Sequence, residues 1–258
     1  MAQIIKVIAK TFEILEILNN EPNLSLKEIT NKVSYPKPTV FRLLNTLSTL
    51  GYIVHDNDSQ TFSISPKFIF FYKGAMTGNE IIASSQSYME ELHNKFNETI
   101  NLVRLVDRST VYVNILESDQ LFKISNNIGD RASLHSTAVG KAILAFLPES
   151  KVDKILKNYS FNRFTKKTIT NISELKKEIA KVKKQGFAID NEEGHDGVFC
   201  VAAPIFDKKH NAIAAISISM PKVRAKKTVL DKIKKELPQI TKKISSKLSG
   251  NNILSQNR

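Results

Sequence analysis

Residues 35–52, YPKPTVFRLLNTLSTLGY, hold two prolines within three positions and then a strongly patterned run that stops at a glycine. Pro36 has no N–H to donate and keeps the residue before it out of the helical region, so it predicts a tight connection. Pro38 is tolerated in the first turn of a helix, where its N–H would be unpaired anyway. The apolar side chains that follow share one helical face: Val40, Leu43, Leu44 and Leu47. Gly51 is expected to end this helix.

Two further helices are predicted before this stretch. Residues 4–20 place apolar side chains on one face that we expect to be buried: Ile8, Phe12, Leu15 and Leu18. Ser25 and Glu28 have the spacing of a capping box, in which the serine oxygen accepts a backbone N–H while the glutamate reaches back to the cap. They open a short helix that is expected to end near Val33.

A β-hairpin is predicted after the third helix, because residues 52–65 form two alternating segments around a polar tip, DNDSQ. Three helices with a tight turn between the second and third, followed by a hairpin, are typical of a winged helix-turn-helix. In that fold, outward residues at the start of the third helix reach the major groove of DNA. The candidate DNA contacts are Ser34, Lys37, Thr39, Phe41, Arg42 and Asn45. Arg42 can bond a guanine or a phosphate, and Asn45 can read an adenine or contact the DNA backbone, so both roles stay open.

The net charge of +13 does not by itself indicate DNA binding, because of where it lies along the 258-residue chain. Residues 1–72 hold 7 basic and 6 acidic side chains, whereas residues 220–258 hold 11 basic and 2 acidic ones. We interpret the C-terminal lysines as the solvated face of an amphipathic helix. A nearly neutral DNA-binding domain is a weak nonspecific binder, because it neutralises few phosphates. We therefore expect a homodimer, or a tetramer, that reads a pseudo-palindrome in double-stranded operator DNA.

The rest of the chain predicts an α+β fold, with antiparallel strands and helices outside them. The stretch from residue 67 to residue 98 is interpreted as a linker helix, and residues 136–147 as a capped apolar helix. Strands are expected at residues 99–107, 110–118, 187–190, 198–206 and 212–220. The single cysteine, Cys200, excludes an internal disulfide. No long apolar run or leader pattern is present, so we expect a cytoplasmic protein without membrane association.

Four blocks of sequence resemble, in order, the IclR family of bacterial transcriptional regulators over roughly residues 4–250. The blocks are LKEITNKVSYPKPTVFRLLNTLSTLGYI, LHSTAVGKAILAFLP, GFAIDNEEGHDGVFCVAAPIFD and AAISISMP. The resemblance implies a winged helix-turn-helix over residues 1–66, a linker helix over 67–98 that helps dimerisation, and a tail over 251–258. Between them it implies an effector-binding domain with a GAF-like or profilin-like fold over residues 99–250. It further implies a ligand-responsive regulator, which is not an enzyme and needs no cofactor or metal.

Within the family, the stretches NEEGHDGVFC, FNRFTKKTIT and SISMPKVR are similar to the branch that responds to 2-keto-3-deoxygluconate. This similarity implies a repressor of a carbohydrate or sugar-acid catabolic operon that a small keto acid releases from DNA. Whether such a protein represses or activates depends on the position of its operator, which the sequence leaves open.

The family's effector-binding residues carry over onto Ala138, Val139, Asp190, Cys200, Ser217 and Ser219. The residues themselves suit a ligand with an acid head and a polyol tail. Ser136 and Thr137 can cap a helix, which leaves the amides that follow them free to bind a carboxylate.

Residues on two predicted strands also suit such a ligand. Ser217 and Ser219 alternate along one strand and so point to the same side. Asp190 ends a strand, where its carboxylate can accept hydrogen bonds from ligand hydroxyls. A keto sugar acid meets this description.

Other interpretations of these residues stay open. Cys200 also fits a small buried core position. A nucleophilic pair with His195 lacks a third group to position it, and a metal site of His135, His195 and Cys200 lacks paired spacing. The alternative from another class is a GAF-type sensor or enzyme whose helix-turn-helix serves interaction rather than operator binding. The lack of an acid–base pair in the sequence argues against catalysis.

Overall fold

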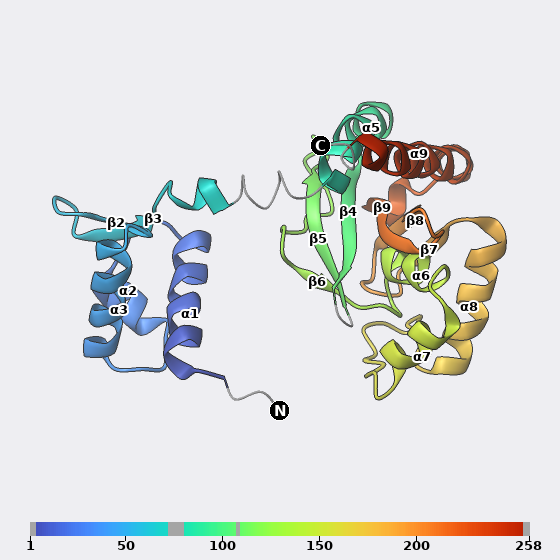
Figure 1. Cartoon of the computed structure of the whole chain (residues 1–258). Helices are drawn as coiled ribbons and strands as arrows, with labels where there is room; N and C mark the ends of the chain where they lie inside the picture. The colour runs from blue at the N-terminus through green and yellow to red at the C-terminus, as the bar shows by residue number, and fades with distance from the viewer. Residues whose placement is uncertain (1–3, 72–79, 107–108, 255–258) are drawn as a thin grey trace. The chain divides into compact units, whose positions relative to one another are not determined.

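The computed structural model describes residues 4–71, 80–106 and 109–254 (Figure 1). The chain forms two compact units, Met1–Gly78 and Asn79–Arg258. Within the described part, no helix is long and apolar enough to cross a membrane.

Up to residue 65, the first unit has three helices and a small antiparallel sheet of strand order β1-β3-β2, and residues 68–71 are again helical. Its elements are α1 (Lys6–Asn20), β1 (Leu24–Ser25), α2 (Leu26–Asn31), α3 (Lys37–Thr49), β2 (Ile53–Asp56) and β3 (Thr61–Ile64). This order of elements confirms the predicted winged helix-turn-helix.

Local signals in the sequence set the ends of these helices. The Ser25 hydroxyl accepts the N–H of Glu28 at 3.4 Å, and the Glu28 carboxylate accepts the N–H of Ser25 at 2.8 Å, which confirms the capping box. Pro36 is the N-cap of α3 and Pro38 lies in its first turn. Gly51 follows the helix with φ +77°, a left-handed conformation that favours glycine.

The predicted buried face of α1 is partly wrong. Ile8 and Phe12 are 50% and 59% exposed, whereas Ile14 and Leu18 are fully covered. Apolar side chains extend around more of α1 than the rest of the unit can bury. Ile14 and Leu18 belong to the core with α3 and β3, and the half-buried Leu15 and Ile17 pack against it, whereas Ile8 and Phe12 lie outside it. Periodicity identifies the apolar arc, but not which part of it is covered.

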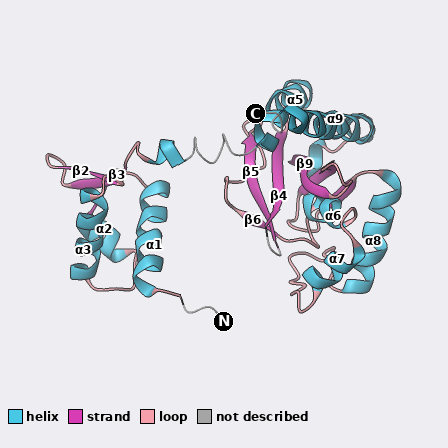
Figure 2. Ribbon diagram, in the orientation of Figure 1, coloured by secondary structure: helices cyan, strands magenta, loops and turns pink. Residues whose placement is uncertain are grey.

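The second unit is built on a six-stranded antiparallel sheet of order β6-β5-β4-β9-β8-β7. The strands are β4 (Thr99–Val106), β5 (Ser109–Leu116), β6 (Arg131–Ala132), β7 (Ala188–Asn191), β8 (Val198–Phe206) and β9 (Ala212–Pro221). The helices are α5 (Glu80–Phe96), α6 (Ala138–Leu144), α7 (Glu149–Leu156), α8 (Ile172–Gln185) and α9 (Lys227–Leu254), with a short 3-10 helix η1 (Lys222–Arg224). Figure 2 shows α5 and α9 together on one side of the sheet and α6 on the other. The predicted α+β fold is therefore confirmed.

Helix α6 forms the centre of the core on its side of the sheet. All of its residues are buried, and they pack with α7, α8 and the facing residues of β8 and β9. A Cβ added at Gly140 would lie 2.6 Å from the Cα and carbonyl oxygen of Leu134. Only glycine therefore allows α6 to lie this close to the segment before it.

The predicted linker helix falls partly on residues 72–79, which lie outside the described residues. Its later part is α5, which packs against α9 and β4 within the second unit. At the other end of the chain, α9 continues to Leu254, into the segment predicted as a tail.

Candidate functional site

The candidate DNA contacts lie on the outward side of α3 and on the turn before it. Lys37, Phe41 and Asn45 follow one another at i, i+4 spacing and are exposed, as are Ser34 and Arg42. Thr39 is half-buried. Residues on the opposite side of α3 fill the core of the unit: Val40, Leu43, Leu44 and Leu47. Five of the six predicted residues are thus exposed on α3 and the turn before it, and Thr39 is half-buried.

The charges on this surface are available for a partner. The side chains of Lys37 and Arg42 make no ion pair with any described residue. At the wing tip, the Asp56 carboxylate accepts the N–H groups of Asp58 at 2.9 Å and Ser59 at 3.4 Å. A side-chain hydrogen bond from Ser59, together with these two backbone bonds, lowers the pKa of Asp56, so the tip carries a negative charge. Of these two elements, α3 therefore carries exposed positive charge and the wing tip does not.

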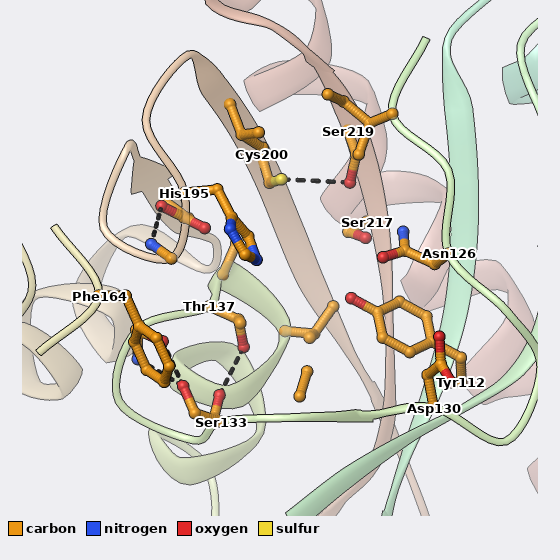
Figure 3. A pocket seen from close by; sticks show the side chains of 18 of the residues that line it. Tyr112, Asn126, Asp130, Ser133, Thr137, Phe164, His195, Cys200, Ser217 and Ser219 are labelled. Carbon is orange, nitrogen blue, oxygen red and sulfur yellow. Dashed lines mark hydrogen bonds between the residues drawn. The ribbon is translucent and has the colours of Figure 1, made fainter. Parts of the chain in front are cut away.

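The candidate effector site is a cavity of about 570 Å³ in the second unit (Figure 3). It lies between the sheet, the start of α6, the β5–β6 connection and the loop after β7. Its wall includes all six residues that the sequence predicted as effector contacts: Ala138, Val139, Asp190, Cys200, Ser217 and Ser219. Residues far apart in the sequence are thus brought to one hollow.

A buried asparagine that the sequence analysis missed lies beneath the two serines. Asn101 is fully buried on β4, directly opposite Ser217 in the β4–β9 register. Its Nδ2 donates to the Oγ of Ser217 at 3.2 Å and to the Oγ of Ser219 at 3.1 Å. The polar position within the apolar run TINLVRLV was the only signal for it in the sequence. Asn101 therefore holds both serine side chains in place at the pocket wall.

Cys200 is both a wall residue and part of the core. It lines the cavity and packs against the apolar cluster around α6. Its thiol donates to the Oγ of Ser219 at 3.1 Å. Burial raises the pKa of the Cys200 thiol, so it stays protonated and is a poor nucleophile.

One carboxylate oxygen of Asp190 accepts hydrogen bonds from the backbone of the loop that follows it. The carboxylate is buried, and its Oδ1 accepts the N–H of Glu193 at 2.7 Å and that of Gly194 at 3.4 Å. Burial raises the pKa of Asp190, and these hydrogen bonds offset part of that effect. A Cβ at Gly194 would lie 3.3 Å from the other carboxylate oxygen. Asp190 thus shapes the loop as well as lining the cavity.

The start of α6 forms the opposite wall. Thr137 is the N-cap, and its Oγ1 accepts the N–H of Gly140 at 3.2 Å while its carbonyl accepts the N–H of Lys141 at 3.1 Å. Ala138 and Val139, the first two residues of α6, line the cavity. Ser136, the other predicted cap, instead pairs its hydroxyl with that of Ser133.

The remaining wall is mostly polar, and none of its residues was predicted as an effector contact. The side chains that Figure 3 shows around the hollow include Tyr112, Asn126, Asp130, Ser133, Phe164 and His195. Burial raises the pKa of Tyr112, which keeps its phenol protonated. Hydroxyl, amide and carboxylate groups on several sides suit a small polar ligand better than an apolar one.

The structure separates the residues of the alternative metal site. His135 is buried, with Nδ1 3.1 Å from the Tyr159 hydroxyl and Nε2 3.0 Å from the carbonyl oxygen of Asn162. Burial lowers the pKa of His135, so it is a neutral part of an aromatic cluster. Across the described residues, no three His, Cys, Asp or Glu side chains are grouped as metal ligands.

A second hollow, of about 820 Å³, lies between α8, α9 and the β8–β9 turn and shares no lining residue with the first. One lining residue is Ser245, whose hydroxyl donates to the carbonyl of Thr241 at 2.7 Å and accepts the N–H of Phe206 at 2.9 Å. The hollow is rimmed by exposed lysines and has one buried polar lining residue, Thr241, whereas the first cavity has several, including Asp190, Ser217 and Ser219. The first cavity is therefore the better candidate for a specific small-molecule site.

Comparison with known proteins decides the family. The model described as "Bacterial transcriptional regulator IclR C-terminal" matches residues 73–246, and the IclR helix-turn-helix domain matches residues 7–57. The chain belongs to the IclR family. As an IclR-family protein it is a DNA-binding transcriptional regulator and not an enzyme, which confirms the resemblance and sets aside the enzyme alternative.

Several IclR-family proteins are similar over most of the chain. The HTH-type transcriptional regulator KdgR of Escherichia coli (strain K12) is 34% identical over 241 residues, covering 93% of this chain and 92% of that protein. KdgR of Dickeya chrysanthemi is 36% identical, covering 84% of this chain and 71% of that protein.

Solved IclR-family structures show the same fold. The crystal structure of the Thermotoga maritima IclR has a TM-score of 0.84 at 29% identity, and covers 95% of this chain and 99% of that one. The C-terminal domain of the E. coli transcriptional regulator KdgR has a TM-score of 0.60 at 35% identity, covering 66% of this chain and 98% of that one.

Proposed function

We propose that this IclR-family regulator represses a sugar-acid catabolic operon and is released from its operator by a small keto acid such as 2-keto-3-deoxygluconate. The observation that carries the proposal is the polar cavity whose wall holds all six expected effector contacts. Similarity to two KdgR proteins over most of the chain supports the choice of sugar acid. The protein acts in the cytoplasm on double-stranded operator DNA.

The pocket chemistry fits a ligand with a carboxylate and several hydroxyls. Backbone amides of Ala138 and Val139 and the hydroxyls of Ser217 and Ser219 can donate to acceptor oxygens of such a ligand. Asp190 uses Oδ1 for its own loop, which leaves Oδ2 to accept from a ligand hydroxyl. An aromatic acid would leave several of these polar groups without partners, which costs affinity.

The DNA-bound form is proposed to be a homodimer. Each first unit offers few unpaired cations on α3, so two copies are needed for useful affinity at physiological salt. Two recognition helices related by a twofold axis read a pseudo-palindromic site. A tetramer would bind two such sites.

Calorimetric titration tests the effector. We expect 2-keto-3-deoxygluconate to bind and benzoate not to bind, with pyruvate and glyoxylate weaker because they make fewer contacts. Ser217→Ala is expected to lower the affinity by roughly 1 kcal/mol, the value of one hydrogen bond. Ser246→Ala, outside this cavity, serves as the control. Binding of benzoate with no binding of any keto acid would refute the assignment.

A further inference from the structure

The side chain of Lys141 is fully buried, although it carries an ammonium group. It lies on α6 among apolar neighbours that are also buried. Its Nζ lies 2.5 Å from Oε1 of Glu193 and 4.0 Å from Oε1 of Glu178. A buried ammonium group is costly unless it is paired, so the stability of this arrangement depends on Glu193.

Glu193 belongs to the loop between β7 and β8, residues 192–197. The next two residues, Gly194 and His195, line the candidate effector cavity. The Glu193 backbone is held by its N–H bond to Asp190 and by its carbonyl, which accepts from Oγ1 of Thr168 at 2.7 Å. Glu193 therefore fixes the part of the loop that forms the pocket wall.

The loop also contains backbone that needs outside support. Glu192 has φ +65°, a left-handed conformation that is unfavourable for a residue with a side chain, and Gly197 has φ +78°. The surrounding side chains must hold such a conformation in place. At Glu192, the carbonyl accepts from Thr165 Oγ1 at 2.7 Å and the carboxylate pairs with Lys167. The Glu193 carboxylate adds a bond from this loop to Lys141 of α6.

The Glu193 carboxylate depends on Lys141 in turn. Its Oε2 is buried and has no hydrogen-bond partner among the described residues. The neighbouring charged groups Asp190 and Glu178 are also acidic and oppose it. Without Lys141, a buried carboxylate would remain near two others, and outward movement of the loop would relieve the repulsion.

Lys141 comes one turn after Ala138 and Val139, which form the other wall of the same cavity. Close packing of Gly140 on Leu134 holds α6 in position. The Lys141–Glu193 pair thus ties one wall of the pocket to the other. We propose that Lys141 is a positioning residue of the effector site, which holds loop 192–197 in its binding geometry through Glu193. The inference rests on the proposed function in taking this cavity as the effector site.

Hydrogen exchange, measured by mass spectrometry on the full-length protein, tests this proposal without a ligand. The variants are Lys141→Met, Glu193→Met and the double variant. Each single variant is expected to lower the melting temperature and to speed amide exchange in residues 193–197 by about tenfold. The double variant removes both buried charges, so its melting temperature should recover, while its loop should still exchange fast.

The outcomes separate positioning from a purely structural role. Lys176→Met is the matched control, because Lys176 forms an exposed pair with Asp153 and should leave the loop unchanged. The proposal is overturned if the double variant regains wild-type exchange in the loop together with its melting temperature. It is also overturned if the single variants leave loop exchange unchanged.

Titration with 2-keto-3-deoxygluconate distinguishes this proposal from the proposed function. If the wild type binds this acid, the double variant is expected to bind it about tenfold more weakly, because its loop is no longer preorganised. Unchanged affinity would overturn the positioning role. If the wild type does not bind it but the loop exchanges as expected, the effector assignment fails and the role of Lys141 in holding the loop stands.

Discussion

Among single residues, Asp190 shows how burial sets the properties of the pocket. Its carboxylate accepts two backbone N–H groups, but burial is the larger effect and raises its pKa. The native protein therefore binds this proton more readily than the unfolded chain does. The stability that this carboxyl contributes is fully present below its unfolded pKa and is lost as the pH rises through the raised value.

Asp190→Asn should change the pH dependence of stability. The asparagine oxygen can still accept the two N–H groups, but the buried charge is gone. The melting temperature of the variant minus that of the wild type is therefore expected to be higher at pH 8 than at pH 5. Asp231→Asn, at an exposed position on α9, provides the baseline. A difference between variant and wild type that is the same at both pH values would contradict this explanation.

Arg42 is the residue on α3 most suited to DNA, because its guanidinium is exposed and has no ion-pair partner in the described structure. Arg42→Ala is expected to weaken binding to operator DNA by roughly 1 to 3 kcal/mol. Lys6→Ala, on α1, removes the same charge elsewhere in the unit and should have a smaller effect. Fluorescence anisotropy with labelled duplex measures both variants, and an unchanged affinity for Arg42→Ala would remove this residue from the site.

Among the elements, α6 depends most on close packing. Replacing a helical glycine by alanine usually stabilises a helix by roughly 0.5 to 1 kcal/mol. At Gly140 the new Cβ would meet backbone atoms of Leu134 at 2.6 Å, so Gly140→Ala should instead destabilise the protein by about 1 to 3 kcal/mol.

Gly250→Ala is the matched control for this prediction. Gly250 lies in α9 and a Cβ there meets nothing within 4 Å, so the variant should be neutral or slightly more stable. Thermal denaturation compares the two. Equal melting temperatures for Gly140→Ala and Gly250→Ala would show that α6 can shift to make room.

The elements that the sequence predicted well are those with local signals. The prolines at the start of α3 and the capping box at Ser25 act over a few residues, and the structure confirms each. Residues that depend on distant partners were missed. Asn101 meets Ser217 across 116 positions, and Lys141 meets Glu193 across 52. The prediction that Ile8 and Phe12 are buried was wrong for a related reason, because burial depends on what packs against the helix.

Across the whole molecule, the exposed apolar residues of α1 bear on the proposed dimer. Ile8 and Phe12 lie uncovered within a single chain, at a cost that burial in a second copy would remove. Light scattering of the wild type is expected to give the mass of two chains. The double variant Ile8→Asp/Phe12→Asp should lower the dimer fraction, whereas Ile172→Asp, at an exposed position on α8, should not. A monomeric wild type would contradict the dimer.

In the proposed function, a keto acid bound in the second unit releases the first unit from DNA. Such coupling is a difference in ligand affinity between DNA-competent and DNA-incompetent states, typically about 1 to 3 kcal/mol. It is measured most directly by gel retardation of DNA from the region upstream of the protein's own coding sequence, at moderate salt, with increasing 2-keto-3-deoxygluconate. We predict specific retardation that the keto acid abolishes and that glucose leaves unchanged. Absence of specific retardation, or retardation that persists at saturating keto acid, would contradict this function.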